Sequence, residues 1–353
     1  MYNFEEYRRL GEPDKAYKSE IWETAIGLQK VDGLTPSEYL VENARQHIDG
    51  DITIEEVKQR LQSYYEAKPV NDLSDRTEEA DKVSAHIAEI LSEKTFTFSP
   101  VEYISVHKRL FDGIYKFAGQ IRDYNISKSE WVLNGDTVVY TSAGNIMATL
   151  EYDFAEEKAF RYRGLTKRQM AEHFADFVSR IWQIHAFGEG NTRTTAVFAI
   201  KYLRTLGFDV SNDMFAEHAW YFRNALVRAN YNNYDCDIFS THEYLNRFFG
   251  NLLLGENNVL RNRDMLVALN GDSVSADNDS VNDSVNDSVK TSADSIDARI
   301  INTLLTNSKA TAVTLSHTIG VSVPTINRHL KKLKAKGIIE RIGSDKTGCW
   351  KVN

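Results

Sequence analysis

The sequence predicts a mostly α-helical protein, in which a helical bundle carries one β-hairpin and is followed by a small α+β domain. Three observations lead to this fold class. Long segments place apolar residues at three- and four-residue spacings, one Asn-Gly pair lies between β-favouring residues, and the polar repeat Asn278–Val289 precedes a separate pattern. A chain of 353 residues is long enough for about two or three domains.

The N-terminal region, residues 1–68, is predicted to form a group of short helices. Ile21–Gln29 has a helical pattern, and the segments Thr35–Glu38 and Thr53–Glu56 each have the hydroxyl and carboxylate spacing of a capping box. Gly33 and Gly50 separate the three helices. We expect this region to form a unit beside a central domain, residues 69–262.

The central domain is predicted to begin with a helix and a β-hairpin. Ser99-Pro100 followed by Glu102 is typical of a helix start, with proline in the first turn. Farther along, Asn134-Gly135 lies between Trp131 and Tyr140 in a run of β-favouring residues, a strong hairpin signal. The hairpin is expected over residues 130–141.

Two amphipathic helices are predicted next, and they flank the most informative segment of the chain. The first, Lys167–Ile184, starts at Thr166, whose side chain can cap the free amides together with Gln169. The second runs from Thr192 to Leu206 and stops at Gly207. The loop between them faces the positive end of the second helix, so free backbone amides there predict an anion site.

This loop, residues 185–193, reads His-Ala-Phe-Gly-Glu-Gly-Asn-Thr-Arg. It brings together a proton acceptor, a carboxylate, two glycines, an amide and a guanidinium. Phosphoryl and nucleotidyl transfer need mainly positioning, charge stabilisation and a base for the nucleophile, and each of these residue types supplies one such role. An isolated His-x-x-x-Glu pair is usually incidental, but the complete loop between two helices favours a phosphate-transfer site.

The pattern His-x-Phe-x-(Asp/Glu)-Gly-Asn-x-Arg resembles the signature loop of the Fic family, whose commonest activity is transfer of AMP from ATP to a protein hydroxyl. The resemblance implies that His185 is the general base, that Glu189 holds Mg, and that Phe187 anchors the loop. Gly190 and Asn191 would line the anion hole, and Arg193 would clamp the phosphates. The nucleotide-binding residues implied are Gly188, Glu189, Gly190, Asn191, Thr192 and Arg193.

Two further segments resemble this family. Ser105–Phe111 with Ala118-Gly119-Gln120-Ile121-Arg122 is similar to the helix and Ala-Gly-x-x-Arg turn that precede the site. The predicted hairpin is similar to the family's flap, which pairs with an extended segment of the target protein. The alternative is a surface hairpin without a docking role. The flap residues implied are Trp131, Val132, Leu133, Asn134 and Gly135.

The N-terminal helices resemble antitoxin-like segments that inhibit Fic enzymes, in which a glutamate pairs with a second arginine of the loop. Here the nearest match, Leu28–Gly33, has Leu28 in place of the hydroxyl residue and Asp32 in place of the glutamate, and Ala196 occupies the position of the second arginine. The coupled losses predict that this inhibition is absent, so that Asp32→Ala changes activity little. The competing hypothesis is an inhibitory Asp32 that pairs with Arg193.

The C-terminal part is predicted to be a flexible linker, residues 263–294, and a compact domain, residues 295–353. Three tandem Asn-Asp-Ser-Val copies are too polar to fold. The order of helices and strands that follows resembles a winged helix-turn-helix with Pro324–Lys336 as recognition helix. A domain that binds a protein partner, or only packs, is the alternative to DNA binding. The possible DNA-binding residues are Thr325, Asn327 and Arg328 toward bases, with Lys331 and Lys332 toward phosphates.

Composition narrows the class of protein. No apolar run approaches the ~20 residues needed to cross a bilayer, and Met1–Arg9 does not read as a secretory signal. Without such a run, we expect no membrane partner. Cys236 and Cys349 are far apart in the sequence, so we expect a reduced cytoplasmic setting. The net charge of −8 argues against nonspecific nucleic-acid binding by the whole chain.

The sequence therefore predicts a Fic-type helical bundle with a β-hairpin flap and a small C-terminal winged-helix domain. The expected activity is Mg-dependent transfer of AMP from ATP to a Ser, Thr or Tyr hydroxyl of a target protein or of the chain itself. Two alternatives stay open: a related Fic chemistry, such as phosphate transfer, other nucleotidyl transfer or AMP removal, and a DNA-binding regulator with a Fic sensor domain. A homodimer is also left open.

Overall fold

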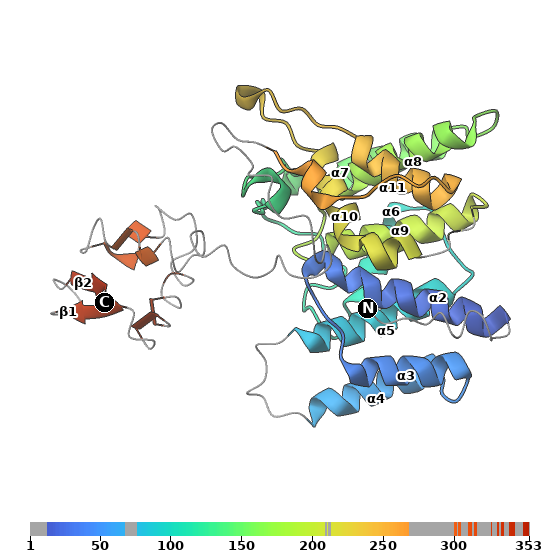
Figure 1. The fold of residues 1–353 in the computed structure, drawn as a ribbon, viewed down its shortest axis with the longest axis horizontal. Coiled ribbons are helices and arrows are strands. Elements are labelled where there is room, and N and C mark those ends of the chain that lie inside the picture. The colour runs from blue at the N-terminus through green and yellow to red at the C-terminus, as the bar shows by residue number, and fades with distance from the viewer. Residues whose placement is uncertain are drawn as a thin grey trace. The chain divides into compact units, whose positions relative to one another are not determined.

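The computed structural model describes residues 13–67, 76–208, 210, 213–267 and a subset of positions between 300 and 352. The chain divides into two compact units, Met1–Asp283 and Ser284–Asn353. Helices dominate the first unit (Figure 1). They are α2 (Pro13–Gly27), α3 (Glu38–Asp49), α4 (Ile54–Glu66), α5 (Thr77–Ser92), α6 (Pro100–Leu110), α7 (Ile146–Ala159), α8 (Lys167–Ile184), α9 (Asn191–Thr205), α10 (Asp213–Ala229) and α11 (Glu243–Leu254). The 3-10 turns are η1 (Leu28–Asp32), η3 (Trp131–Leu133), η4 (Ala143–Asn145), η5 (Tyr234–Cys236) and η6 (Asn262–Met265).

The helix starts follow the capping signals of the sequence. Both α4 and α8 begin with complete capping boxes, at Thr53 and Thr166, as predicted. In α6 the Ser99 hydroxyl accepts a hydrogen bond from the amide of Glu102. One predicted start was wrong, because α3 is capped by Ser37, which accepts from the amide of Leu40, and not by Thr35. A serine directly before the first helical residue satisfies the first-turn amide better than a threonine two residues earlier.

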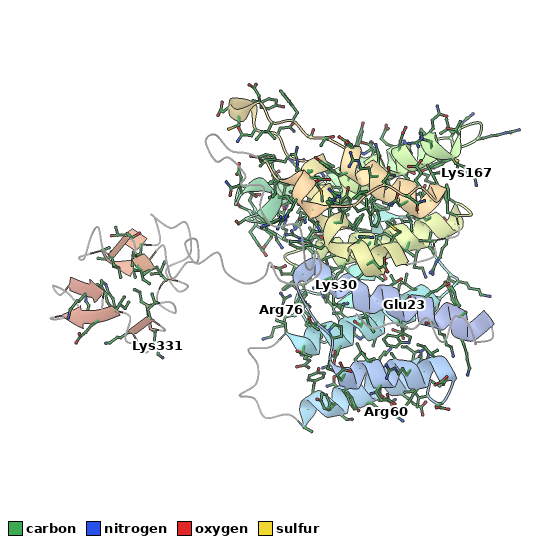
Figure 2. All side chains as sticks on the ribbon, viewed as in Figure 1. Glu23, Lys30, Arg60, Arg76, Lys167 and Lys331 are labelled. Atoms are coloured by element: carbon green, nitrogen blue, oxygen red, sulfur yellow. The ribbon has the colours of Figure 1, made fainter. Side chains whose placement is uncertain are left out.

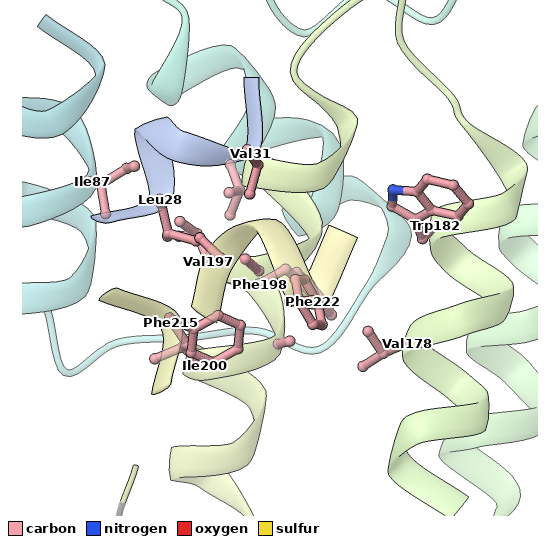
Figure 3. Close-up of a cluster of buried hydrophobic side chains, with 14 of the residues drawn as sticks. Leu28, Val31, Ile87, Val178, Trp182, Val197, Phe198, Ile200, Phe215 and Phe222 are labelled. Atoms are coloured by element: carbon pink, nitrogen blue, oxygen red, sulfur yellow. The ribbon is translucent and has the colours of Figure 1, made fainter. Parts of the chain in front are cut away.

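Helix α9 lies at the centre of the bundle, and every residue from Asn191 to Leu203 is buried. It packs against α6, α5 and α8. Aliphatic and aromatic side chains of α9 fill this core together with those of the N-terminal turn η1; Leu28 lies beside Val197 in Figure 3. The position of α9 at the centre fixes the loop that precedes it.

The N-terminal helices pack on the central bundle. Helix α2 begins at Pro13, earlier than the predicted Ile21, and packs against α5 and α10. At its end, a Cβ added to Gly27 would lie 2.3 Å from the Cα of Ala216, so only glycine allows this close approach to α10. The chain then continues into η1, which contacts α9 and ends at Gly33. This packing brings the N-terminal segment to the loop that precedes α9.

The second unit has a core of its own, formed by apolar side chains of residues 300–339. Strands β1 (Ile339–Ile342) and β2 (Cys349–Val352) pair antiparallel, with Ile339 opposite Val352. Its core residues are Ile300, Leu304, Ala310, Leu315, Ile326, Leu330, Leu333 and Ile339. The predicted linker falls mainly on residues 268–294, which lie outside the described residues. In the described part of the chain, no helix has the length and apolar character required to cross a membrane.

Candidate active site

Residues 185–190 form the loop that joins α8 to α9, and residues 191–193 of the predicted loop form the first turn of α9. His185 follows the last residue of α8 and has left-handed backbone angles, φ 49° and ψ 55°, which are uncommon for a residue with a side chain. Gly190, with φ 77°, directly precedes α9. A Cβ at Gly190 would come within 2.3 Å of the Phe111 ring, so the loop can follow this path only with glycine there.

The His185 imidazole is buried between two aromatic rings. It lies 4.2 Å from the ring of Tyr140 and meets Trp182 edge-on, and the residue is only 3% exposed. Within the described residues, neither ring nitrogen makes a hydrogen bond of good geometry, although the ring interacts weakly with the Trp182 backbone. Buried polar atoms are normally paired. An imidazole that the bundle does not tie by a well-formed hydrogen bond is able to interact with a bound group.

Burial, with the charges of Lys128 and Arg223 adding to it, holds the pKa of His185 well below its usual value. The pKa falls because burial and nearby positive charge both disfavour the imidazolium form. His185 is therefore neutral at physiological pH. A neutral imidazole can accept a proton.

Arg122 holds the backbone on both sides of His185. Its Nε donates to the His185 carbonyl at 2.7 Å, and its terminal nitrogens donate to the carbonyls of Tyr124, Thr141 and Ile184. Its own backbone amide donates to the Ala186 carbonyl at 3.0 Å. The planar guanidinium, with five donors, can bridge several carbonyls at once. We assign Arg122 as a positioning residue, which fixes the left-handed turn that presents His185.

His107 holds the other end of the loop. Its Nδ1 accepts a hydrogen bond from the amide of Gly119 at 2.9 Å, so Nε2 carries the proton and donates to the Glu189 carbonyl at 3.0 Å. The imidazole stacks on Phe187 with ring centres 3.7 Å apart. Burial lowers the pKa of His107 to about 4, which keeps this arrangement neutral. The sequence analysis assigned no role to His107, although this residue lies in the segment Ser105–Phe111, which resembles a helix of the family.

The side chain of Asn191 is engaged within the loop. Its Oδ1 accepts from the amide of Phe187 at 3.0 Å, and its Nδ2 donates to the Phe187 carbonyl at 2.8 Å. Both amide groups are thus used inside the loop, and the residue is 2% exposed. Asn191 therefore closes the loop, and any anion would be held by backbone amides at the start of α9. Thr192 is also engaged, since its hydroxyl accepts from the Trp182 indole at 3.0 Å.

Arg193 is fully buried and surrounded by groups from the N-terminal half of the chain. Its Nη2 donates to Glu79 Oε1 at 2.6 Å, and its Nη1 donates to Gln29 Oε1 at 3.0 Å. Its Nε lies 2.8 Å from Asp32 Oδ2, an ion pair in which the N–H does not point along the line to the oxygen. The Phe111 ring covers the guanidinium at 4.8 Å. The clamp predicted for phosphates is therefore held by protein carboxylates in this structure.

Asp32 lies against Arg193, which is the contact that the competing hypothesis requires. The second arginine is replaced by Ala196, and η1 brings Asp32 instead to Arg193, one turn earlier on α9. Burial opposes ionisation of Asp32, but the charges of Arg193, Arg223, Lys128 and Arg76 together hold its pKa below the usual value.

Sequence reasoning also missed Glu79, the second carboxylate on Arg193. Glu79 lies in the first turn of α5 and is only 8% exposed. Arg76 binds it through two nitrogens at 2.8 and 2.9 Å, and the Tyr115 hydroxyl donates to it at 2.6 Å. Its pKa is lowered, because the Arg193 charge and these hydrogen bonds outweigh the opposing effect of burial. The only signal in the sequence was an acidic first turn, which is common at helix starts.

Glu189, the predicted magnesium ligand, lies at the open side of the loop with its side chain 51% exposed. Its Oε2 is 3.0 Å from Lys128 Nζ. Among the described residues, no group of three or more His, Cys, Asp or Glu side chains could hold a metal ion. A single exposed carboxylate fits Mg, because this ion is usually bound through one or two carboxylates together with substrate phosphates.

The flap reverses at Asn134 and Gly135, as predicted, and both residues have positive φ angles. The segments beside the turn differ from the expected regular strands. Trp131–Leu133 forms the turn η3, and Val132 and Leu133 are buried in the core. Two hydrogen bonds join the arms at Glu130, whose amide donates to Asp136 and whose carbonyl accepts from Gly135. Two consecutive apolar side chains that both point inward require a helical turn, since a strand would alternate them.

Of the residues predicted to contact DNA, the structure describes only Lys331. Lys331 is exposed, beside the buried Leu330 and Leu333. Thr325, Asn327, Arg328 and Lys332 lie outside the described residues.

Two segments of the chain match models of known families. Residues 97–203 match the Fic/DOC family model, and residues 294–340 match a model for winged helix-turn-helix DNA-binding domains. Over 108 residues, the chain is 27% identical to the protein adenylyltransferase VbhT of Bartonella schoenbuchensis. The match covers 31% of this chain and spans about a fifth (21%) of the length of that relative.

Similar solved structures include a Fic family protein from Desulfovibrio desulfuricans, at 13% identity and a TM-score of 0.42, over 95% of this chain and 87% of that one. Another is the BepC effector protein of Bartonella tribocorum with bound AMPPNP, at 18% identity and a TM-score of 0.40, over 53% of this chain and 89% of that one.

Proposed function

We propose that this protein, whose residues 97–203 match the Fic/DOC family model, transfers AMP from ATP to a hydroxyl side chain of a target protein or of itself. The observation that carries the proposal is the neutral, buried His185 beside the start of α9, whose ring nitrogens make no well-formed hydrogen bond within the described part of the chain. The similarity to a protein adenylyltransferase of Bartonella schoenbuchensis supports the same chemistry.

The proposed reaction assigns one role to each part of the loop. The target hydroxyl oxygen forms a bond to the α-phosphorus, and His185 takes the proton of that hydroxyl. The bond from the α-phosphorus to the oxygen that bridges to the β-phosphate breaks, and pyrophosphate leaves with that electron pair. Backbone amides at the start of α9 stabilise the charge on the α-phosphate. Glu189 would hold Mg, which would neutralise charge on the phosphates.

Arg193 must exchange a partner before it can contact phosphates. Asp32 is the partner that can leave more easily, because its side chain is 22% exposed whereas that of Glu79 is 9% exposed and is bound by Arg76 and Tyr115. We propose that the Asp32–Arg193 pair restrains the enzyme until ATP binds. This replaces the expectation that the N-terminal segment has lost its inhibitory role.

The experiment that tests this function uses the full chain, Mg and ATP labelled at the α- or the γ-phosphate, with cell lysate as the source of targets. Transfer of the α label alone is expected. Replacing His185 with Ala should lower transfer by about 10²–10⁴-fold and leave ATP binding intact, because the imidazole acts on the hydroxyl proton. Transfer of the γ label would point instead to phosphate transfer, and full activity of the His185→Ala variant would refute the role of His185.

The match of residues 294–340 to winged helix-turn-helix domains favours a second function, DNA binding by the C-terminal unit. The exposed Lys331 follows Leu330, which packs into the core of this unit, so the amphipathic segment presents positive charge to solvent. The protein would then be a regulator whose Fic domain modifies a target near its DNA site. A fall of DNA affinity with rising salt would test this function.

A further inference from the structure

The catalytic loop supplies too little positive charge for a nucleotide triphosphate. Across residues 185–200, Arg193 is the only lysine or arginine. Its guanidinium is fully buried and already lies against two carboxylates, Asp32 and Glu79. A triphosphate carries more negative charge than one Mg ion neutralises, so phosphate-transfer sites usually add a cationic side chain.

Lys128 is a cation that reaches the open side of the loop from outside it. Its Nζ is 3.0 Å from Glu189 Oε2, and its side chain is 23% exposed. Its backbone amide donates to the Thr137 hydroxyl at 3.1 Å, across the arms of the flap. The flap therefore fixes the backbone of Lys128, while the long side chain reaches the side of the loop where Glu189 is open to solvent.

The charge of Lys128 also acts on the rest of the site. After burial, it is the largest charge effect that lowers the pKa of His185, and it is one of the charges that lower the pKa of Asp32. Lys128 thus lies within electrostatic reach of the proposed base, the proposed metal ligand and the carboxylate on Arg193. A cation placed among these three groups is well positioned for an anionic substrate.

Resting on the proposed function, we propose that Lys128 is a phosphate-binding residue of this site, which contacts the β- or γ-phosphate of ATP. Without nucleotide its ammonium pairs with Glu189. If Glu189 held Mg, the ammonium would be free to bind phosphate oxygens instead. An ammonium on a flexible four-carbon stem suits this exchange, because it can rotate between two acceptors that lie close together.

The test measures binding of Mg-ATP and of AMP to the full chain by equilibrium titration. His185→Ala serves as the background, so that no transfer occurs. Adding Lys128→Met should weaken ATP binding at least about tenfold and change AMP binding less than about twofold, because AMP has no β- or γ-phosphate. Lys128→Arg should keep ATP affinity within about threefold, since it retains the charge.

The matched control is Lys167→Met, at the N-terminal end of α8, which is the end farther from His185 (Figure 2). This exposed lysine should be replaceable with no change in either affinity. Equal losses of ATP and AMP binding in Lys128→Met would overturn the proposal, and so would unchanged ATP binding. If no variant bound ATP, the phosphate site itself would be refuted.

The two proposals can fail separately. If the protein with His185 intact transfers AMP but Lys128→Met binds ATP normally, only the role of Lys128 is wrong. If no transfer is found with any lysate, yet Lys128→Met loses ATP binding selectively, the lysine binds phosphate and the proposed transfer is wrong.

Discussion

Replacing Asp32 with Asn tests whether the N-terminal segment controls the site. The substitution keeps the shape of the side chain and removes its charge. In the structure, Arg193 Nε is 2.8 Å from Asp32 Oδ2 and Arg193 Nη2 is 2.6 Å from Glu79 Oε1. The change therefore leaves Arg193 with one carboxylate partner, so the arginine stays ordered but has one side to offer to phosphate.

The size of the effect follows from the geometry. Two charges about 4 Å apart attract by about 4 kcal/mol at the effective dielectric constant of ~20 that suits protein sites. Part of this is lost because Asp32 is partly exposed to solvent, and because the amide of the variant would still offer a carbonyl oxygen. We expect a net effect of about 1–3 kcal/mol, which corresponds to ATP binding about 5–150-fold more tightly.

The assay is titration of Mg-ATP into the full chain, together with the rate of self-modification. The affinity for Mg-ATP and the rate of self-modification should both rise in Asp32→Asn and in Asp32→Ala. The gain should disappear when Arg193→Gln is added. Asp51→Asn is the matched control, because Asp51 is exposed in the same N-terminal region. Unchanged ATP affinity in Asp32→Asn would refute the restraint and show that Glu79 and Gln29 alone hold Arg193.

Three further predictions concern positioning, pH and the second unit. Arg122→Lys should lower the transfer rate about 100-fold with little change in ATP affinity, because one ammonium cannot hold four carbonyls and His185 would shift; a loss confined to ATP binding would contradict this. The pKa of His107 is lowered from 6.5 to about 4, so its stabilising contribution is complete above pH 6.5 and is lost as the pH falls toward 4. Denaturant unfolding over this range should show about 3 kcal/mol more loss of stability in the native protein than in His107→Asn, and equal losses would exclude His107 as the cause. A fragment of residues 292–353 should fold on its own core, and any DNA affinity it has should fall steeply with salt; shift assays without binding at low salt would favour a protein partner.

Local features of the fold followed from the sequence because their signals are local. Three features depend on neighbouring residues only: the limits of α8, the capping boxes at Thr53 and Thr166, and the turn at Asn134-Gly135. The regular flap strands were not found because burial of both Val132 and Leu133 is decided by the core beneath them. A tertiary contact outweighed a local β preference there.

The candidate site shows the same division. The order of His185, Glu189 and Arg193 in one loop could be read directly. The partners of these residues are far away in the chain. Arg122 is 63 residues from His185, Lys128 is 61 residues from Glu189, and Glu79 is 114 residues from Arg193. No spacing rule connects groups so distant in sequence. The side-chain contacts of Asn191 could not be read from the sequence either, since its amide bonds to the Phe187 backbone, which only the folded loop brings near.

The charges of the site suggest why two of these tests should have opposite signs. Without nucleotide, Arg193 lies against Asp32, and Lys128 lies against Glu189, so each cation is balanced by a carboxylate. An incoming triphosphate must replace one partner in each pair. In the first pair the partner that must leave is the acid, so its removal should strengthen binding. In the second pair the lysine is itself the proposed phosphate ligand, so its removal should weaken binding. A general loosening of the site would move both affinities in the same direction, and opposite shifts in Asp32→Asn and Lys128→Met therefore separate specific charge exchange from damage to the fold.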